Sequence, residues 1–287
     1  MLAIFKREIR AYFQTPIGYL YMGLFLLLTG IFFTFQNLFN GNSEYTGFLN
    51  NVLFIYLFAI PLLTMRLFSE EKRQKTDQLL LTSPVSITGI VCGKFLAAMA
   101  VFCGTLLVTA AYAVVISVYG DLQTSETVGS YIGFIFLGAS YVAVGLFVSA
   151  GTENQLAAGL VTFFALMIIW IIDPVAQAVP MDVQAGIISA IVLLGAVIIF
   201  LFFSTRNWVI VAATAVLGGL AIGLFYLFAD HLFYGFIQNF LGWFSLNRRY
   251  QPFSMGLLDF ESLLYYISFS GLFLFLTIRL IEKRRWN

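Results

Sequence analysis

Apolar residues gather into eight long stretches along the chain, and short polar segments separate them. Each stretch is long enough to cross about 30 Å of hydrocarbon, because an α-helix rises about 1.5 Å per residue. The predicted spans cover residues 17–36, 51–68, 91–119, 131–150, 155–172, 186–204, 207–229 and 262–281. The pattern therefore predicts an all-α polytopic membrane protein with about eight transmembrane helices.

The positive charges predict how these helices are oriented. When the chain is threaded alternately through the eight spans, 13 of its 15 Lys and Arg residues fall on the side that the two termini share. Arg248 and Arg249 fall on the opposite side. Because Lys and Arg in short loops stay in the cytoplasm, both termini are expected there.

The composition agrees with a membrane protein and argues against several other functions. The chain is 61% apolar and 10% charged, whereas soluble domains are about 25% charged. A net charge of +1 gives no support to nucleic-acid binding. Cys92 and Cys103 lie on one predicted helix, and a rise of about 16 Å between them excludes a disulfide within it. No spacing in the sequence predicts a metal site.

The chain shows no energy source of its own. Charged side chains are nearly absent from the spans, which argues against an ion-coupled carrier, and Arg66 and Lys94 are expected to snorkel to the cytoplasmic headgroups. Gly89 to Lys94 differs from a phosphate-binding loop in its glycine spacing, and Phe95 replaces the Ser or Thr that binds Mg²⁺. His231 has no nearby nucleophile. We expect neither enzymatic activity nor a cofactor in this chain.

The amino-terminal segment, residues 1–14, is predicted to form an amphipathic helix in the inner membrane interface. Its apolar face carries Leu2, Phe5, Ile9, Tyr12 and Phe13, and its opposite face carries Lys6, Arg10 and Gln14. The basic residues are expected near anionic lipid headgroups. Thr15 and Pro16 are the expected N-cap and first position of the first span. The helix is either a topology anchor or an element that couples to a soluble partner.

A second cytoplasmic helix is predicted in the segment 69–86. Ser69 is expected to cap it and Pro84 to end it, while Ser86 begins the helix of the third span. The residues expected to dock on a partner are Glu70, Glu71, Thr76, Leu79, Leu80, Leu81 and Pro84. A charged helix that ends in three leucines suits a groove in a partner, although the leucines could instead dip into the interface.

An aromatic and nearly uncharged stretch dominates the outer segment 230–261. It is expected to form an interfacial or partly re-entrant helix in the outer leaflet. Phe236, Phe240 and Trp243 are candidates for an outer gate, because bulky rings close a narrow passage without desolvating a charge. The alternative is an aromatic belt without a role in transport. A path without charge at depth is expected to favour substrates with substantial apolar surface.

The order of these features resembles the permease subunits of type-2 ABC exporters. The resemblance rests on Glu70-Glu-Lys-Arg73, Thr76-Asp-Gln-Leu-Leu80, Thr82-Ser-Pro84 and a Gly93-Lys94 pair that opens the next span. The run from Phe253 to Asp259 and the ending Arg284-Arg285-Trp286 are similar to the gliding-motility-associated branch. The pair of spans near 186–229 departs from the pattern, since these permeases commonly have six spans.

This resemblance implies a coupling helix at about 70–83 that docks on a nucleotide-binding ATPase subunit, and an interfacial gate helix at 1–14. It implies a permease domain at 15–287, paired with a second copy or a paralogue in the cytoplasmic (plasma) membrane of a prokaryote. ATP and Mg²⁺ would then bind to the partner, whose hydrolysis drives export. The alternative is a membrane subunit of an ATP-driven motility, secretion or envelope complex that translocates no solute.

The charge asymmetry makes the topology testable by cysteine labelling. We expect a membrane-impermeant thiol reagent to label Glu44→Cys and Arg248→Cys in intact cells, in a background without Cys92 and Cys103. Lys283→Cys should react only after the cells are permeabilised, because positive charge keeps that end inside. Labelling of Lys283→Cys in intact cells would overturn the orientation.

Overall fold

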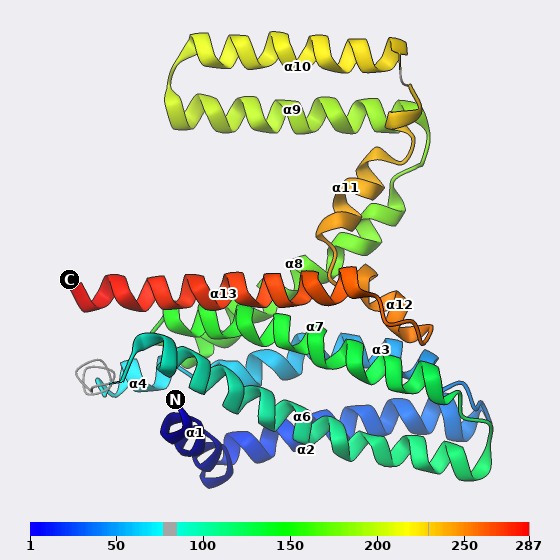
Figure 1. Cartoon of the computed structure of the whole chain (residues 1–287), viewed down its shortest axis with the longest axis vertical. Coiled ribbons are helices and arrows are strands. Elements are labelled where there is room, and N and C mark those ends of the chain that lie inside the picture. The colour runs from blue at the N-terminus through cyan, green and yellow to red at the C-terminus, as the bar shows by residue number, and fades with distance from the viewer. Residues whose placement is uncertain (77–84, 229, 287) are drawn as a thin grey trace. The chain divides into compact units, whose positions relative to one another are not determined.

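The computed structural model describes residues 1–76, 85–228 and 230–286, and within these ranges the chain is helical with no strand (Figure 1). Eight of the helices are long and apolar enough to cross a membrane. The predicted fold class and number of spans are therefore confirmed. The chain divides into two compact units, one of Met1–Ile168 with Arg249–Asn287 and one of Ile169–Arg248.

The first unit holds the amino-terminal helices and the last span. Its elements are α1 (Leu2–Gln14), α2 (Pro16–Phe33) with a π-helical extension (Thr34–Phe39), α3 (Tyr45–Thr64), α4 (Ser69–Arg73), α6 (Ile87–Tyr119), α7 (Thr124–Gly151), the first part of α8 (Gln155–Ala178), α12 (Gln251–Ser254) and α13 (Phe260–Trp286). A short 3₁₀ turn (Arg248–Tyr250) precedes α12.

Several helix boundaries follow from local sequence signals. Ser86 caps α6 as predicted, since its hydroxyl accepts a hydrogen bond from the Gly89 N–H at 3.2 Å. Pro16 stands at the first position of α2, also as predicted. The Thr15 hydroxyl makes no cap; it donates instead to the Ala11 carbonyl at 2.8 Å. Thr15 thus stands at the predicted N-cap position of α2, without a hydrogen bond from its side chain to the helix start.

Helices extend beyond the apolar stretches that revealed them. The fourth span was expected to begin at residue 131, but α7 begins at Thr124. The added residues are mostly small or polar, which lowers their hydropathy without preventing a helical turn outside the hydrocarbon. Hydropathy thus locates the part of a helix that lies among lipid tails, and the helix itself runs further.

The core of the first unit lies around α3 and α7. In the apolar stretches of these two spans, 72% and 67% of the residues are buried, more than in the other spans. Tyr56 of α3 is fully buried at its centre. The Tyr56 ring meets Phe102 of α6 and Phe134 of α7, each with 5.4 Å between ring centroids and a steep angle between the rings. Edge-to-face aromatic contacts of this kind hold the three helices together.

Glycines on α7 allow its neighbours to approach closely. A Cβ added at Gly145 would lie 2.2 Å from the Thr64 hydroxyl oxygen of α3, and one at Gly138 would lie 2.3 Å from the Phe102 ring. At Gly133 it would lie 2.8 Å from the Tyr250 ring. Small residues at such positions are how transmembrane helices pack in the absence of a hydrophobic driving force between them.

The second unit contains the remainder of α8, a hairpin of two apolar helices and an aromatic helix. Its elements are α9 (Val183–Thr205), α10 (Trp208–Phe228), a 3₁₀ turn (Asp230–Phe233) and α11 (Phe236–Phe244). Asp182 caps α9 by accepting from the Ala185 N–H at 3.2 Å, and Arg206 ends it in a left-handed conformation. The two long helices lie side by side and antiparallel (Figure 1).

The close approach of α7 to α3 predicts the effect of a single methyl group. Gly145→Ala should lower the free energy of unfolding by about 1–3 kcal/mol, because the new Cβ collides with Thr64 in a packed core. Gly104→Ala on α6 is the matched control, since a Cβ there meets nothing within 4 Å. Thermal unfolding of the two purified variants in detergent checks this; equal midpoints would contradict the packing of α3 on α7.

Candidate functional site

Charged side chains meet inside the first unit where α1, α4 and α6 come together. The Lys94 side chain of α6 is 1% exposed, and its Nζ lies 2.9 Å from Glu8 Oε1 of α1 and 3.1 Å from Glu71 Oε1 of α4. Lys94 Nζ also donates to the Leu67 carbonyl at 2.6 Å. Arg7 contacts both carboxylates and lies 2.7 Å from Glu8. We call Arg7, Glu8, Glu71 and Lys94 the ionic joint.

The sequence of α1 explains how a carboxylate reaches this buried position. Ile4, Glu8 and Tyr12 recur at four-residue spacing, so they share one face, and all three are buried. On α6, Gly93 leaves room for that face, since a Cβ added there would lie 3.1 Å from Ile4 Cγ2. The helix α1 therefore lies against α6, with Glu8 directed at Lys94.

The charges of the ionic joint compensate one another. Burial by itself raises the pKa of Glu8, but the positive charges of Lys94 and Arg7 outweigh it and hold the pKa below its ordinary value of 4.5. Arg7 is half-exposed, and the two carboxylates beside it hold its pKa above the ordinary value despite partial burial. Glu8 is therefore ionised at neutral pH and contributes a negative charge to the joint.

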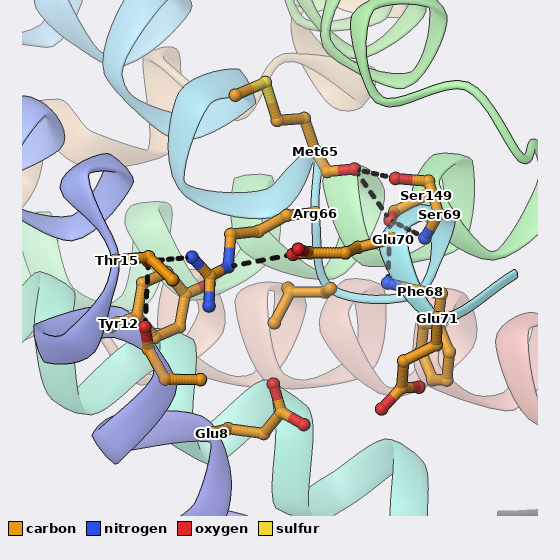
Figure 2. A network of polar contacts seen from close by, with 12 residues as sticks. Glu8, Tyr12, Thr15, Met65, Arg66, Phe68, Ser69, Glu70, Glu71 and Ser149 are labelled. Carbon is orange, nitrogen blue, oxygen red and sulfur yellow. Dashed lines mark hydrogen bonds and ion pairs between the residues drawn. The ribbon is translucent and has the colours of Figure 1, made fainter. Parts of the chain in front are cut away.

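A second set of polar contacts binds the corner between α1 and α2 to the end of α3 (Figure 2). The Arg66 side chain is 5% exposed; it donates to the Thr15 hydroxyl and lies 3.7 Å from Glu70. Its guanidinium stands 4.8 Å from the centre of the Tyr12 ring. The Tyr12 hydroxyl donates to the Leu63 carbonyl at 2.6 Å. These contacts satisfy the polar groups that burial removes from water.

A third set fixes α4 to the end of α7. The Ser149 hydroxyl accepts from the Phe68 N–H at 3.0 Å and from the Ser69 N–H at 3.2 Å, and it donates to the Met65 carbonyl at 3.2 Å (Figure 2). Lys72 donates to the Ala150 carbonyl, at the negative end of α7. The short helix α4 is thus held from three sides, by α1, α6 and α7.

Three local expectations are corrected by this geometry. Arg66 and Lys94 do not snorkel to headgroups; they are buried because α1 and α4 supply carboxylates that pair with them. Ser69 does not cap α4, since its hydroxyl donates to the Met65 carbonyl of the preceding turn. The helix α4 ends at Arg73, well before residue 83, and Lys75 has a left-handed backbone with φ of 57°.

Three of the predicted docking residues lie in the described part of the chain, and four lie outside it. Glu70 and Glu71 lie on α4, where their carboxylates contact Arg66, Lys94 and Arg7 of the same chain. Thr76 is exposed, and its hydroxyl donates to the Glu71 carbonyl at 3.3 Å. The remaining predicted docking residues, Leu79, Leu80, Leu81 and Pro84, lie outside the described residues.

The predicted outer gate residues all lie on one short helix of the second unit, α11. The Phe236 and Phe240 rings stack with 6.2 Å between centroids, and Trp243 meets Phe244 edge-on at 5.2 Å. Trp243 is 62% exposed within the chain. A helix in the outer aromatic segment was expected, and α11 confirms it.

The part of the chain that the structure describes has no group of three or more His, Cys, Asp or Glu that could hold a metal ion. Cys92 and Cys103 are free thiols. His231 lies exposed on the turn before α11.

Residues 47–187 match the family described as ABC-2 family transporter protein, and this range runs from α3 to the start of α9. No curated protein matches the chain. With the eight apolar helices, the match supports an integral membrane protein and a permease of the ABC-2 type. Such a permease is the membrane component of an ABC transporter and not itself a catalytic ATPase.

The burial of Lys94 predicts a large cost for removing its charge. Lys94→Met keeps the length of the side chain but leaves Glu8 and Glu71 without their shared partner, so it should lower the free energy of unfolding by about 3–5 kcal/mol. Lys283→Met, which removes an exposed charge, is the control. Thermal unfolding in detergent measures both. A Lys94 variant as stable as the control would show that the ionic joint does not stabilise the fold.

The lowered pKa of Glu8 predicts acid sensitivity. A carboxyl whose folded pKa lies below 4.5 stabilises the fold fully above that value and loses the contribution as the pH falls through the folded pKa. Stability should therefore be flat from pH 7 to about 5 and fall below about 4. Unfolding midpoints over a pH series should show a smaller acid loss in Glu8→Gln than in the unaltered protein. Identical slopes for the two would mean that Glu8 carries no paired charge.

Proposed function

We propose that this chain is the permease subunit of an ATP-driven type-2 ABC export system and that it couples hydrolysis by a separate nucleotide-binding subunit to export. The observation that carries the proposal is the place of the ionic joint. It lies at the start of the cytoplasmic segment 69–86, and the ABC-2 match covers that segment together with α3, α6 and α7. The segment is thus fastened to the helices that a partner would have to move.

The contacts of α4 suggest how force would pass. A partner that pushes on residues 76–86 would act on α4 directly, since α4 immediately precedes them. From α4 the push reaches α1 and α6 through Glu71 and reaches α7 through Ser149 and Lys72. Breaking one buried charge pair costs about 3–5 kcal/mol, and inverting a two-state population from 1:99 to 99:1 takes about 5.5 kcal/mol. One pair alone falls short of this bias, so α4 would transmit it through the pair together with its contacts to Arg7, Ser149 and Ala150.

The partner contact is assigned to the exposed part of the segment. Glu70 and Glu71 are engaged within the chain, so we give them the role of positioning α4. Thr76 and the three leucines at 79–81 are assigned to a groove of the ATPase, with Pro84 closing the segment. ATP and Mg²⁺ bind to that partner, and a second copy of the permease or a paralogue completes the path.

The proposed location is the cytoplasmic membrane of a prokaryote, with both termini inside. The proposed nearer relationship is to the gliding-motility-associated branch, on the strength of the run from Phe253 to Asp259. That run has a clear structural use: Phe253 is fully buried against α7, and the Asp259 carboxylate accepts from the Ser262 N–H at 3.1 Å at the start of α13. It therefore sets how the last span enters the bundle.

The proposed path favours a substrate with substantial apolar surface, such as a lipid-linked molecule or an amphipathic peptide. The stacked rings of Phe236 and Phe240, with Trp243 one turn further on, are assigned as its outer gate. The second candidate function is a motility, secretion or envelope complex in which the same coupling does mechanical work without a solute. The hairpin of α9 and α10 in the second unit, which is additional to the common six spans, favours it. Substrate-stimulated ATPase activity separates the two.

The assignment of the leucines is tested by co-purification. The triple variant Leu79→Ala, Leu80→Ala, Leu81→Ala should recover much less ATPase subunit than the unaltered chain, because each buried Leu→Ala change costs about 2 kcal/mol or more. The control is Leu257→Ala with Leu258→Ala, two exposed leucines of the loop before α13. Undiminished recovery with the triple variant, at equal membrane insertion, would place the docking surface elsewhere.

A further inference from the structure

An apolar groove runs along the hairpin of the second unit, between α9, α10 and α11. Its volume is about 590 Å³, and every one of its lining residues is apolar. The walls include Ala190, Leu194 and Phe200 of α9, Gly218 of α10, and Phe236 and Phe240 of α11. Gly218 brings the helices close, since a Cβ there would lie 2.3 Å from Leu194 Cδ1. The contact of Gly218 with Leu194 therefore closes the groove on its inner side, and the opposite side is open to the surface of the unit.

The helix α9 is long and apolar enough to cross a membrane, and on a spanning α9 the groove falls at the depth of lipid hydrocarbon. Along α9 it extends from Ala190 to Phe200, which is about 15 Å at the helical rise. Polar residues mark the two ends of this helix, with Asp182 capping its start and Arg206 following its last turn. Asp182 precedes the groove by about 12 Å and Arg206 follows it by about 9 Å. The groove therefore accepts a chain from the membrane interior and does not reach a headgroup.

The size of the groove distinguishes between its possible occupants. A helix 10 Å in diameter and 15 Å long occupies about 1,200 Å³, twice the volume available. A volume of 590 Å³ falls within the range of about 300–1,000 Å³ that is typical of small-molecule sites. A single hydrocarbon chain is slender enough to enter along the whole length. An inserted helix from a second copy is not.

The aromatic wall of the groove has space behind it. Phe236 and Phe240 also line a second cavity of about 470 Å³, together with Leu232, Asn239, Trp243 and Phe244. Rings with space on both faces can tilt without displacing a packed neighbour, in contrast to a ring in a close-packed core. The wall can therefore adjust to chains of different width.

We propose that this groove binds one hydrocarbon chain of a membrane lipid, with Phe236 and Phe240 as its adjustable wall. The second unit thereby becomes a lipid-binding module. The proposal rests on the chain being an integral membrane protein and does not depend on ATP coupling or on export.

The test is photolabelling of the full chain in phosphatidylcholine vesicles. A trace of phosphatidylcholine with a diazirine in the middle of one acyl chain is included, and labelled residues are mapped by mass spectrometry after illumination. Labelling at Ala190, Phe236 and Phe240 should exceed severalfold that at Val192, which is 64% exposed on α9 but does not line the groove. Ala190→Phe should reduce labelling of the groove, and Val192→Phe should leave it unchanged.

Three results would overturn the proposal. They are equal labelling at the groove and at Val192, persistence of groove labelling in Ala190→Phe, and cross-linking of the groove to another copy of the chain instead of to lipid. If Ala190→Phe does not yield folded protein, Ala196→Phe fills the same groove from another position. Because labelling is measured without any ATPase subunit, failure of the proposed export function would not affect the result.

Discussion

The buried Lys94 side chain constrains the end of the first unit at which α1, α4 and α6 meet. The Lys94 side chain is 1% exposed, and an uncompensated charge in such a buried place costs several kcal/mol. Its compensation comes from Glu8 and Glu71, which belong to two helices that precede it in the chain, α1 and α4. The requirement to neutralise one charge thus brings together α1, α4 and α6.

The remaining contacts follow from that arrangement. Once α1 lies against α6, Tyr12 and Thr15 reach the end of α3. There the Tyr12 hydroxyl donates to the Leu63 carbonyl, and Arg66 donates to the Thr15 hydroxyl. Once α4 is held by Glu71, its backbone meets Ser149 at the end of α7. The core of the bundle around Tyr56 is apolar and aromatic. Apolar packing of this kind is less directional than hydrogen bonds and ion pairs. The polar contacts at one end of the bundle therefore fix where α4 lies relative to α1, α6 and α7.

The spans were predictable from sequence because hydropathy acts over a whole helix and needs no partner. The Ser86 cap was predictable for a similar reason, since it involves residues three positions apart. The ionic joint was not, because Glu8 and Lys94 are 86 residues apart. A signal existed: Glu8 falls midway between Ile4 and Tyr12 on one helical face. The end of α4 and the division into two units depend on tertiary contacts that no local pattern contains.

The central claim is that α1 and α4 form one mechanical element. Spin labels at Lys6→Cys of α1 and Arg73→Cys of α4, both exposed positions, would measure the distance between them in a background without Cys92 and Cys103. In the complex with the ATPase subunit, the distance distribution should be the same with and without a non-hydrolysable ATP analogue. It should broaden or shift when Lys94→Met is added. A nucleotide-dependent change with the joint intact would contradict the account.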